Sequence, residues 1–424
     1  MNNSASARSQ PPYSTSSPTF YARPSLDRDH YAIGRFITHF VETTSTATPG
    51  YMEFLPHMLQ RTFDETRNAI LAVSLASLSN VSRNQELRVE SLVYYGRALQ
   101  SLRAAMNDHT TAIADSTMLN IVIIQMYDTI AGTNDLIIDK IDHHEIATTE
   151  LLRLRSSTPH ASETSRKLSE IVKTRKEILL IHNCSRKESG SYTPLSPAQS
   201  FRFYLREVST ACARLLQTRQ SSFRYSSSFI EALDDAVGLY AESSRWPAST
   251  SVEWRYRPHL PPKDISAQGI SQIFLFKDIQ HSGIWQLYFC SRIHLCQALL
   301  GAYSFLHSEK ATGPTSNRSQ LSGKDIRKTL LAAVDDIISC APYLLGDVDD
   351  EGHMVRSNIE RKGLGAFFLL RGLMVAISAR DLLQRQRRLL LDLLNRIGVE
   401  FGIHAAWRLR EDWIASHRTE AAQL

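Results

Sequence analysis

Acidic residues cluster at three places in the sequence: the Asp pairs at 234–235 and 335–336, and the run DVDDE at 347–351. On a helix, such a pair with a third acid three residues later would direct several carboxylates into one cavity, where they could hold magnesium and a diphosphate. Gly238 and Ser339 stand where that third acid is required. The run 347–351 is flanked by glycines, which favours a solvated loop. We expect no catalytic metal site from these acids.

Two other short patterns fail as chemical motifs. His143 and His144 are adjacent, so their side chains project about 100° apart on a helix and cannot easily share one metal ion. They fit better as the polar first turn of a helix that runs to Leu154. The stretch 322–324, SGK, resembles the end of a phosphate-binding loop, but Asp325 replaces the required Ser or Thr. We predict no catalytic, metal-binding or cofactor-binding residues.

Basic residues gather in two segments. The segment 166–176 is interleaved with glutamates, as on a solvated helix face that carries ion pairs four residues apart. Arg385, Arg387 and Arg388 form a second cluster without such acids. A cluster of this kind is typical of a nuclear-localisation signal or of a phosphate-contacting patch.

The elements that must position these residues are helices. No proline lies between Pro56 and Pro159, and none follows Pro342. Apolar residues recur at helical spacing in these stretches, for example at 92, 95, 99, 102 and 106. The pattern predicts helices over 86–106, 115–127, 284–306, 367–394 and 404–414, with Asp115 or Ser116 as the N-cap of the second.

The predicted fold class is all-α. The one alternating run, at 252–256, is too short and isolated to build a sheet. Residues 1–30 hold seven Ser, two Thr and four Pro, so we expect a disordered Ser/Pro-rich segment there. A single large multi-helix domain is then expected over residues 31–424.

Composition excludes several classes of protein. The chain has 424 residues and a net charge of +5, which is too small to argue nucleic-acid binding by itself. No stretch approaches 18 uninterrupted apolar residues, so we expect no membrane span. Five widely spaced cysteines fit a reducing compartment better than a disulfide framework.

The helices as a set resemble the large regulatory domain of fungal zinc-cluster transcription factors, the fungal-specific transcription factor domain. Each stretch is only weakly specific, so the resemblance rests on their order and spacing. They are AILAVSLASL at 69–78 with YYGRALQSLRAA at 94–105, DSTMLNIVIIQMYD at 115–128, WQLYFCSRIHLCQALL at 285–300, and APYLLG at 341–346 with LLLDLLNRIGVEFGIHAA at 389–406. The resemblance covers the chain from about Tyr31 onward.

Members of this family read DNA through a zinc cluster of six cysteines. The first cysteine of this chain is Cys184, so the sequence begins, in effect, at the Ser/Pro-rich linker that follows such a module. We therefore expect either a natural regulator without that module or a gene model that has lost its first exon. Zinc is expected only if the module exists upstream, and DNA is contacted only indirectly or through it.

The resemblance implies a nuclear transcription regulator. We expect it to act through contacts with other transcription regulators or the transcription machinery, or through a small-molecule effector. Trp285 and Arg292 are candidate effector contacts in the centre of the domain; the alternative is a core Trp and a satisfied Arg. Two other classes stay open: a terpene cyclase-like lyase with a degenerate metal site, and a helical scaffold protein.

Overall fold

The structure is a computed structural model that describes residues 27–42, 51–133, 150–155, 162–169, 171–172, 197–220, 226–307, 322–355 and 363–417. Within these ranges the chain is almost entirely helical, which confirms the all-α prediction. Most of the predicted Ser/Pro-rich segment and the His143-His144 pair lie outside the described residues. The first helix begins at Arg28, three residues earlier than the predicted domain start.

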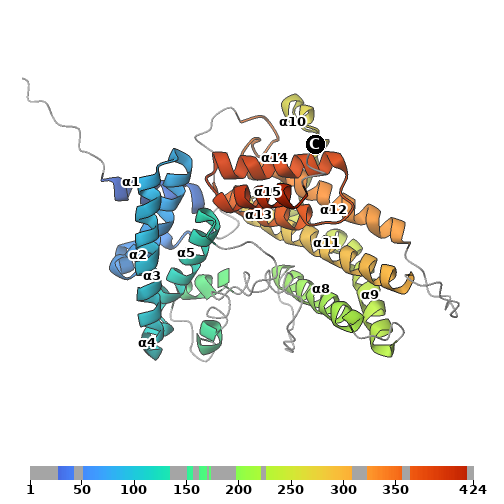
Figure 1. The fold of residues 1–424 in the computed structure, drawn as a ribbon, viewed down its shortest axis with the longest axis horizontal. Helices are drawn as coiled ribbons and strands as arrows, with labels where there is room; N and C mark the ends of the chain where they lie inside the picture. The colour runs from blue at the N-terminus through green and yellow to red at the C-terminus, as the bar shows by residue number, and fades with distance from the viewer. Residues whose placement is uncertain are drawn as a thin grey trace, which may run out of the picture.

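The first group of helices lies together on one side of the molecule (Figure 1). Its members are α1 (Arg28–Phe40), α2 (Leu55–Ser82), α3 (Gln85–Met106), α4 (His109–Ala112) and α5 (Asp115–Ala131). Asn84 caps α3 by accepting from the backbone N–H groups of Glu86 and Leu87. As its apolar sequence predicts, α5 is buried on nearly all sides.

Two details of this group differ from prediction. The N-cap of α5 is Ala114, because the carboxylate of Asp115 is taken up by Arg155 at 2.6 Å and by Ser165. Helix α3 has the predicted extent, but α2 packs against the side that carries Ala98 and Leu102, so Leu92 of the predicted core face is exposed.

The second group holds the helices from residue 197 onward. They are α8 (Pro197–Gln220), α9 (Ser227–Ser249), α10 (Lys263–Ala267), α11 (Ile279–His307), α12 (Gly323–Leu344), α13 (Gly363–Ile377), α14 (Gln384–Glu400) and α15 (His404–Ser416). Helix α11 packs against α8, α9, α12 and α13, so it occupies the middle of the group (Figure 1).

The predicted helix over 367–394 is two helices. Helix α13 ends at Ile377 and α14 begins at Gln384, and Asp381 between them has a left-handed backbone with φ 61°. No glycine or proline marks this break in the sequence, and the helical spacing of apolar residues continues across it, so the sequence predicted one helix. The glycines at 398 and 402 predict a turn before the last helix. Gly402 forms it, with φ 67°, whereas the prediction is wrong for Gly398, which lies inside α14.

A small sheet lies beside α11. Residues Val252–Trp254 form a 3₁₀ turn, η1, and strand β1 (Arg257–His259) pairs antiparallel with β2 (Ile273–Leu275). The prediction that the run 252–256 builds no sheet holds for that run, but the strand begins one residue later and includes Pro258. Proline is tolerated here because each strand of a two-stranded sheet has a free edge.

The two groups meet where the ends of α2 and α5 approach the turn before α15. The side-chain amide of Asn80 donates to the carbonyl oxygens of Ile130 at 2.7 Å and Gly402 at 2.8 Å, and Arg408 donates to that of Gly132. One contiguous cluster of buried apolar side chains runs from α1 to α15. None of the helices in the described ranges has the length and apolar run needed to cross a bilayer.

Candidate functional site

The second group encloses a cluster of aromatic side chains, called here the aromatic cluster. Its members are Trp246, Tyr256, Phe274, Phe276, Trp285, Tyr288 and Phe289. The turn η1 and the two strands bring Tyr256 onto Phe274, with ring centroids 4.0 Å apart, and onto Trp285 at 4.6 Å. Edge-to-face and offset contacts of this kind stabilise a packed interior beyond the area that they bury.

Trp285, one of the two predicted effector residues, lies inside this cluster. Its side chain is buried, and its indole N–H donates to the backbone carbonyl of Trp254 at 2.7 Å. A buried indole needs one hydrogen-bond partner, and here a backbone group supplies it. The geometry is that of a packed core residue.

Arg292, the other predicted residue, lies two turns further along α11 and is half-buried. Its guanidinium is 5.7 Å from the ring centroid of Tyr288 and donates to the Tyr288 hydroxyl at 3.3 Å. That hydroxyl in turn donates to the carbonyl of Ser243 on α9. Trp285 also contacts Tyr288, edge to face at 5.5 Å, so the two predicted residues meet through this one tyrosine.

Asp336 on α12 is a charged residue whose burial the sequence analysis did not predict. Burial raises the pKa of its carboxyl to about 7, against the lowering effect of the positive charge of Arg292. Its neighbour Asp335 points elsewhere and accepts from Arg385 at 2.6 Å. A sequence signal existed: Asp336 lies three residues after buried Ala333 and four before buried Cys340, on the apolar face of α12.

The acidic run 347–351 is divided between two surroundings. Asp347 is buried and forms a two-pronged ion pair with Arg396 on α14, at 2.6 and 2.5 Å. The expectation of a wholly solvated loop is therefore wrong for this residue. Its charge has a partner, as a buried carboxylate requires.

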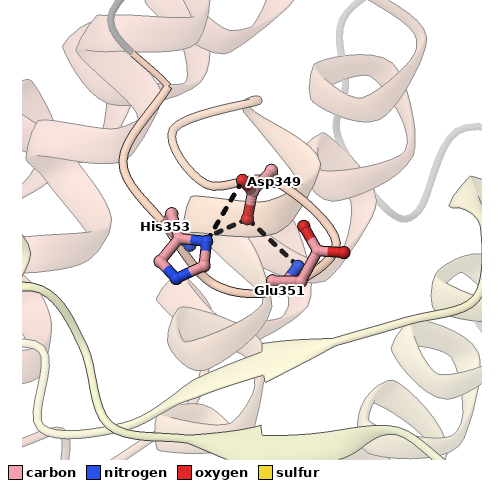
Figure 2. Close-up of side chains that lie close together, drawn as sticks. All are labelled: Asp349, Glu351 and His353. Carbon is pink, nitrogen blue, oxygen red and sulfur yellow. Dashed lines mark hydrogen bonds and ion pairs between the residues drawn. The ribbon is translucent and has the colours of Figure 1, made fainter.

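Asp349, Glu351 and His353 follow on an exposed turn. Figure 2 shows their side chains close together, and their potential ligand atoms all lie within 4.8 Å of one another. Two carboxylates and an imidazole are ligands that zinc or manganese accepts. One Asp349 oxygen, however, accepts from the backbone N–H groups of Glu351 at 3.0 Å and His353 at 2.8 Å, and these bonds lower the pKa of its carboxyl. The turn by itself explains the arrangement.

The three arginines of the predicted nuclear-localisation cluster point in different directions from α14. Arg385 binds Asp335 and the carbonyl of Gly269 at 3.0 Å, whereas Arg387 lies over the ring of Trp413 on α15 at 5.5 Å. Arg388 is exposed. The ring of Trp413 and Arg387 border a cleft of about 640 Å³ between the end of α13 and α15. The structure does not bring the three charges together, and the targeting role stays a prediction.

Comparison with known proteins gives one match. Residues 35–240 match the family described as the fungal specific transcription factor domain. The match contains the stretches at 69–78, 94–105 and 115–128 on which the resemblance rests, and ends before the stretches on α11 and beyond. No curated protein and no solved structure matches the chain. The family indicates a transcription regulator.

Proposed function

We propose that the protein is a transcription regulator of the zinc-cluster family that acts in the nucleus through its helical domain. The observation that carries the proposal is the family match over residues 35–240, which runs from the second half of α1 into α9. Its partners in this proposal are other transcription regulators or the transcription machinery. DNA is contacted through such a partner or through a zinc-cluster module outside these residues.

The proposal includes no catalytic step. The acids of the three predicted clusters lie on α9, on α12 and on the turn after α12. Of these, Asp235 is paired with Arg214, Asp335 with Arg385 and Asp347 with Arg396. A magnesium-diphosphate site needs several carboxylates that face one cavity, and these ion pairs engage the acids separately.

An effector, if the domain senses one, is proposed to contact Arg292 rather than Trp285. Arg292 and Asp336 offer opposite charges beside the rings of Tyr256 and Tyr288, and both charged side chains are partly open to solvent. The indole N–H of Trp285 already has a backbone partner, so this residue packs against the rings of Tyr256 and Tyr288 in the core and has no free donor for an effector.

The experiment fuses the full chain to an unrelated DNA-binding domain in fungal cells that carry a matching reporter gene. We expect reporter transcription to rise or fall at least several-fold relative to the DNA-binding domain alone. A nuclear, folded fusion that leaves the reporter unchanged would contradict a role in transcription. Exclusion of the tagged protein from nuclei, with stable cytoplasmic partners, would support the helical scaffold instead.

A matched pair of variants tests the effector role. Arg292→Lys keeps the charge, whereas Arg292→Met removes it at similar length. If Arg292 binds an effector, Arg292→Met changes the reporter response to growth conditions while the thermal stability of the two variants stays similar. Equal responses from wild type and both variants would remove Arg292 from the proposal.

A further inference from the structure

Three exposed apolar side chains lie where the two groups of helices meet, and they are called here the junction patch. They are Val81 near the end of α2, Val399 near the end of α14 and Trp407 on α15. Their exposed fractions are 40%, 47% and 41%. A partly exposed tryptophan is typical of a contact surface, because Trp is enriched where one protein binds another.

The three side chains are close to one another in space. A Cβ added to Gly402 would lie 2.8 Å from Cγ2 of Val81, and a Cβ added to Gly398 would lie 2.8 Å from Cβ of Trp407. Val399 lies between these two glycines in the chain, at the end of α14. The junction patch therefore connects α2 of the first group with α14 and α15 of the second.

Basic side chains border the junction patch. The ring of His404 contacts that of Trp407, with centroids 5.1 Å apart. Burial lowers the pKa of His404, and the positive charges of Arg88 on α3 and Arg408 on α15 lower it further, so both arginines lie near this ring. Arg83, the residue that ends α2, is exposed like Arg88. Within the described residues, neither Arg83 nor Arg88 forms an ion pair.

The acids on the same helices do not offset these charges. Glu400 at the end of α14 is paired with Arg396 at 3.0 Å, and Glu411 on α15 is paired with Arg410. Glu86 belongs to another side of α3, where it lines a shallow groove. The border of the junction patch therefore carries a net positive charge.

This combination of side chains restricts what can bind to the junction patch. A second copy of the same surface would bring like charges together, which opposes association. A nucleic acid would offer phosphates to the arginines but would leave Trp407 and the two valines without apolar contacts. A protein segment that carries both carboxylates and apolar side chains satisfies both halves of the surface.

We propose that the junction patch binds a segment of another protein in which acidic residues alternate with apolar ones. The apolar side chains of this segment pack on Trp407, Val81 and Val399, and its carboxylates lie beside Arg88 and Arg83. Because the bound segment contacts both groups of helices, it also holds them together. The inference is independent of the function proposed above, since it rests on this surface alone.

The experiment measures the binding of a short fluorescent peptide of repeated Asp-Leu-Asp-Phe units to the full chain, by fluorescence anisotropy. The matched peptide has Lys in place of every Asp. We expect wild type to bind the acidic peptide at least about tenfold more tightly. Arg88→Glu should weaken that binding about tenfold. Arg103→Glu is the control, because Arg103 is exposed on the same helix outside the patch, and it should leave the affinity nearly unchanged.

A second pair of variants tests the apolar half of the surface. Trp407→Ala should weaken the binding of the acidic peptide about tenfold. Since Trp407 also contacts α14 within the chain, Val399→Ser provides a milder change with the same expected direction. Its control is Val89→Ser, because Val89 is 54% exposed on α3 and lies outside the patch.

Three outcomes would overturn the proposal. One is a wild type that binds the acidic peptide no more tightly than the lysine peptide. Another is binding that Arg88→Glu and Val399→Ser weaken no more than their controls do. The third is displacement of the peptide by duplex DNA whose own affinity depends on Arg88 but not on Trp407, which would assign the surface to a nucleic acid.

Discussion

Helices α3 and α13 both contain glycines, and these glycines have opposite surroundings. Around Gly96 of α3 there is open space, whereas a Cβ on Gly365 of α13 would lie 1.9 Å from the carbonyl oxygen of Leu344. On the same helix, a Cβ on Gly372 would lie 2.0 Å from the side-chain oxygen of buried Gln286. Helix α13 thus lies inside the second group, where its glycines approach neighbouring atoms closely. Helix α3 lies at the surface, and within the described residues one of its faces is exposed. The same residue type allows close packing within the chain in one region and meets open space in the other.

The largest effect is expected where the packing is tightest. Gly365→Ala forces α12 and α13 apart, because a backbone carbonyl cannot move as a flexible side chain does. We expect the free energy of unfolding to fall by about 4 kcal/mol. Chemical denaturation followed by circular dichroism measures it. A loss below about 1 kcal/mol would mean that α12 and α13 are less tightly packed than the approach of Gly365 to the Leu344 carbonyl implies.

The second prediction concerns charge rather than shape in the same group. Asp347→Ala leaves the guanidinium of Arg396 partly buried beside α14, with Glu400 as its remaining acidic partner. We expect a loss of about 3 kcal/mol in the free energy of unfolding. The double variant Asp347→Ala with Arg396→Met should recover a part of that loss. Equal losses in the single and double variants would mean that the pair itself, and not the stranded charge, is responsible.

The third prediction is a pH dependence. Because burial raises the folded-state pKa of Asp336 to about 7, from 3.8, this group binds a proton in the folded protein that the unfolded chain has lost. Its contribution to stability is therefore present below pH 4 and is lost as the pH rises to about 7. Asp336→Asn keeps the shape without the charge.

At pH 8 we expect the free energy of unfolding of Asp336→Asn to exceed that of wild type by about 2 kcal/mol, after allowance for solvent screening. At pH 4 the two proteins should differ little. Denaturant midpoints at the two pH values measure the difference. Burial lowers the pKa of His294 to about 4, so this residue changes the pH dependence of stability in the opposite direction. His294 is present in both proteins, so its contribution cancels when the variant is compared with wild type. A variant that is less stable at pH 8 would show that the Asp336 charge is needed by Arg292.

The smallest effect is expected on α3. Gly96→Ala adds a methyl group in open space and reduces the freedom of the unfolded chain, so the free energy of unfolding should rise by about 0.7 kcal/mol. Chemical denaturation measures this gain. A loss instead of a gain would mean that Gly96 packs against something within its own chain, and the contrast with Gly365 would disappear.

The sequence predicted where the helices lie better than it predicted what their residues contact. Helices α3, α5, α11 and α15 are where apolar spacing placed them. The break between α13 and α14 was missed, because Asp381 adopts a left-handed backbone without a glycine to mark it. Asp336 was treated together with Asp335 as a possible metal motif, since adjacent acids look alike until the face that each occupies is known.

Periodicity and motif order were enough to predict the all-α class and the resemblance to the family whose model matches residues 35–240. They depend on residues close together in the chain, where helix geometry relates spacing to face. Only the tertiary structure decided what each face meets: α2 on one side of α3 and solvent on the other, Asp347 inside and Asp349 outside. Those outcomes depend on partners far away in sequence, such as Arg396 for Asp347, and burial is a property of the whole packed chain rather than of any one helix.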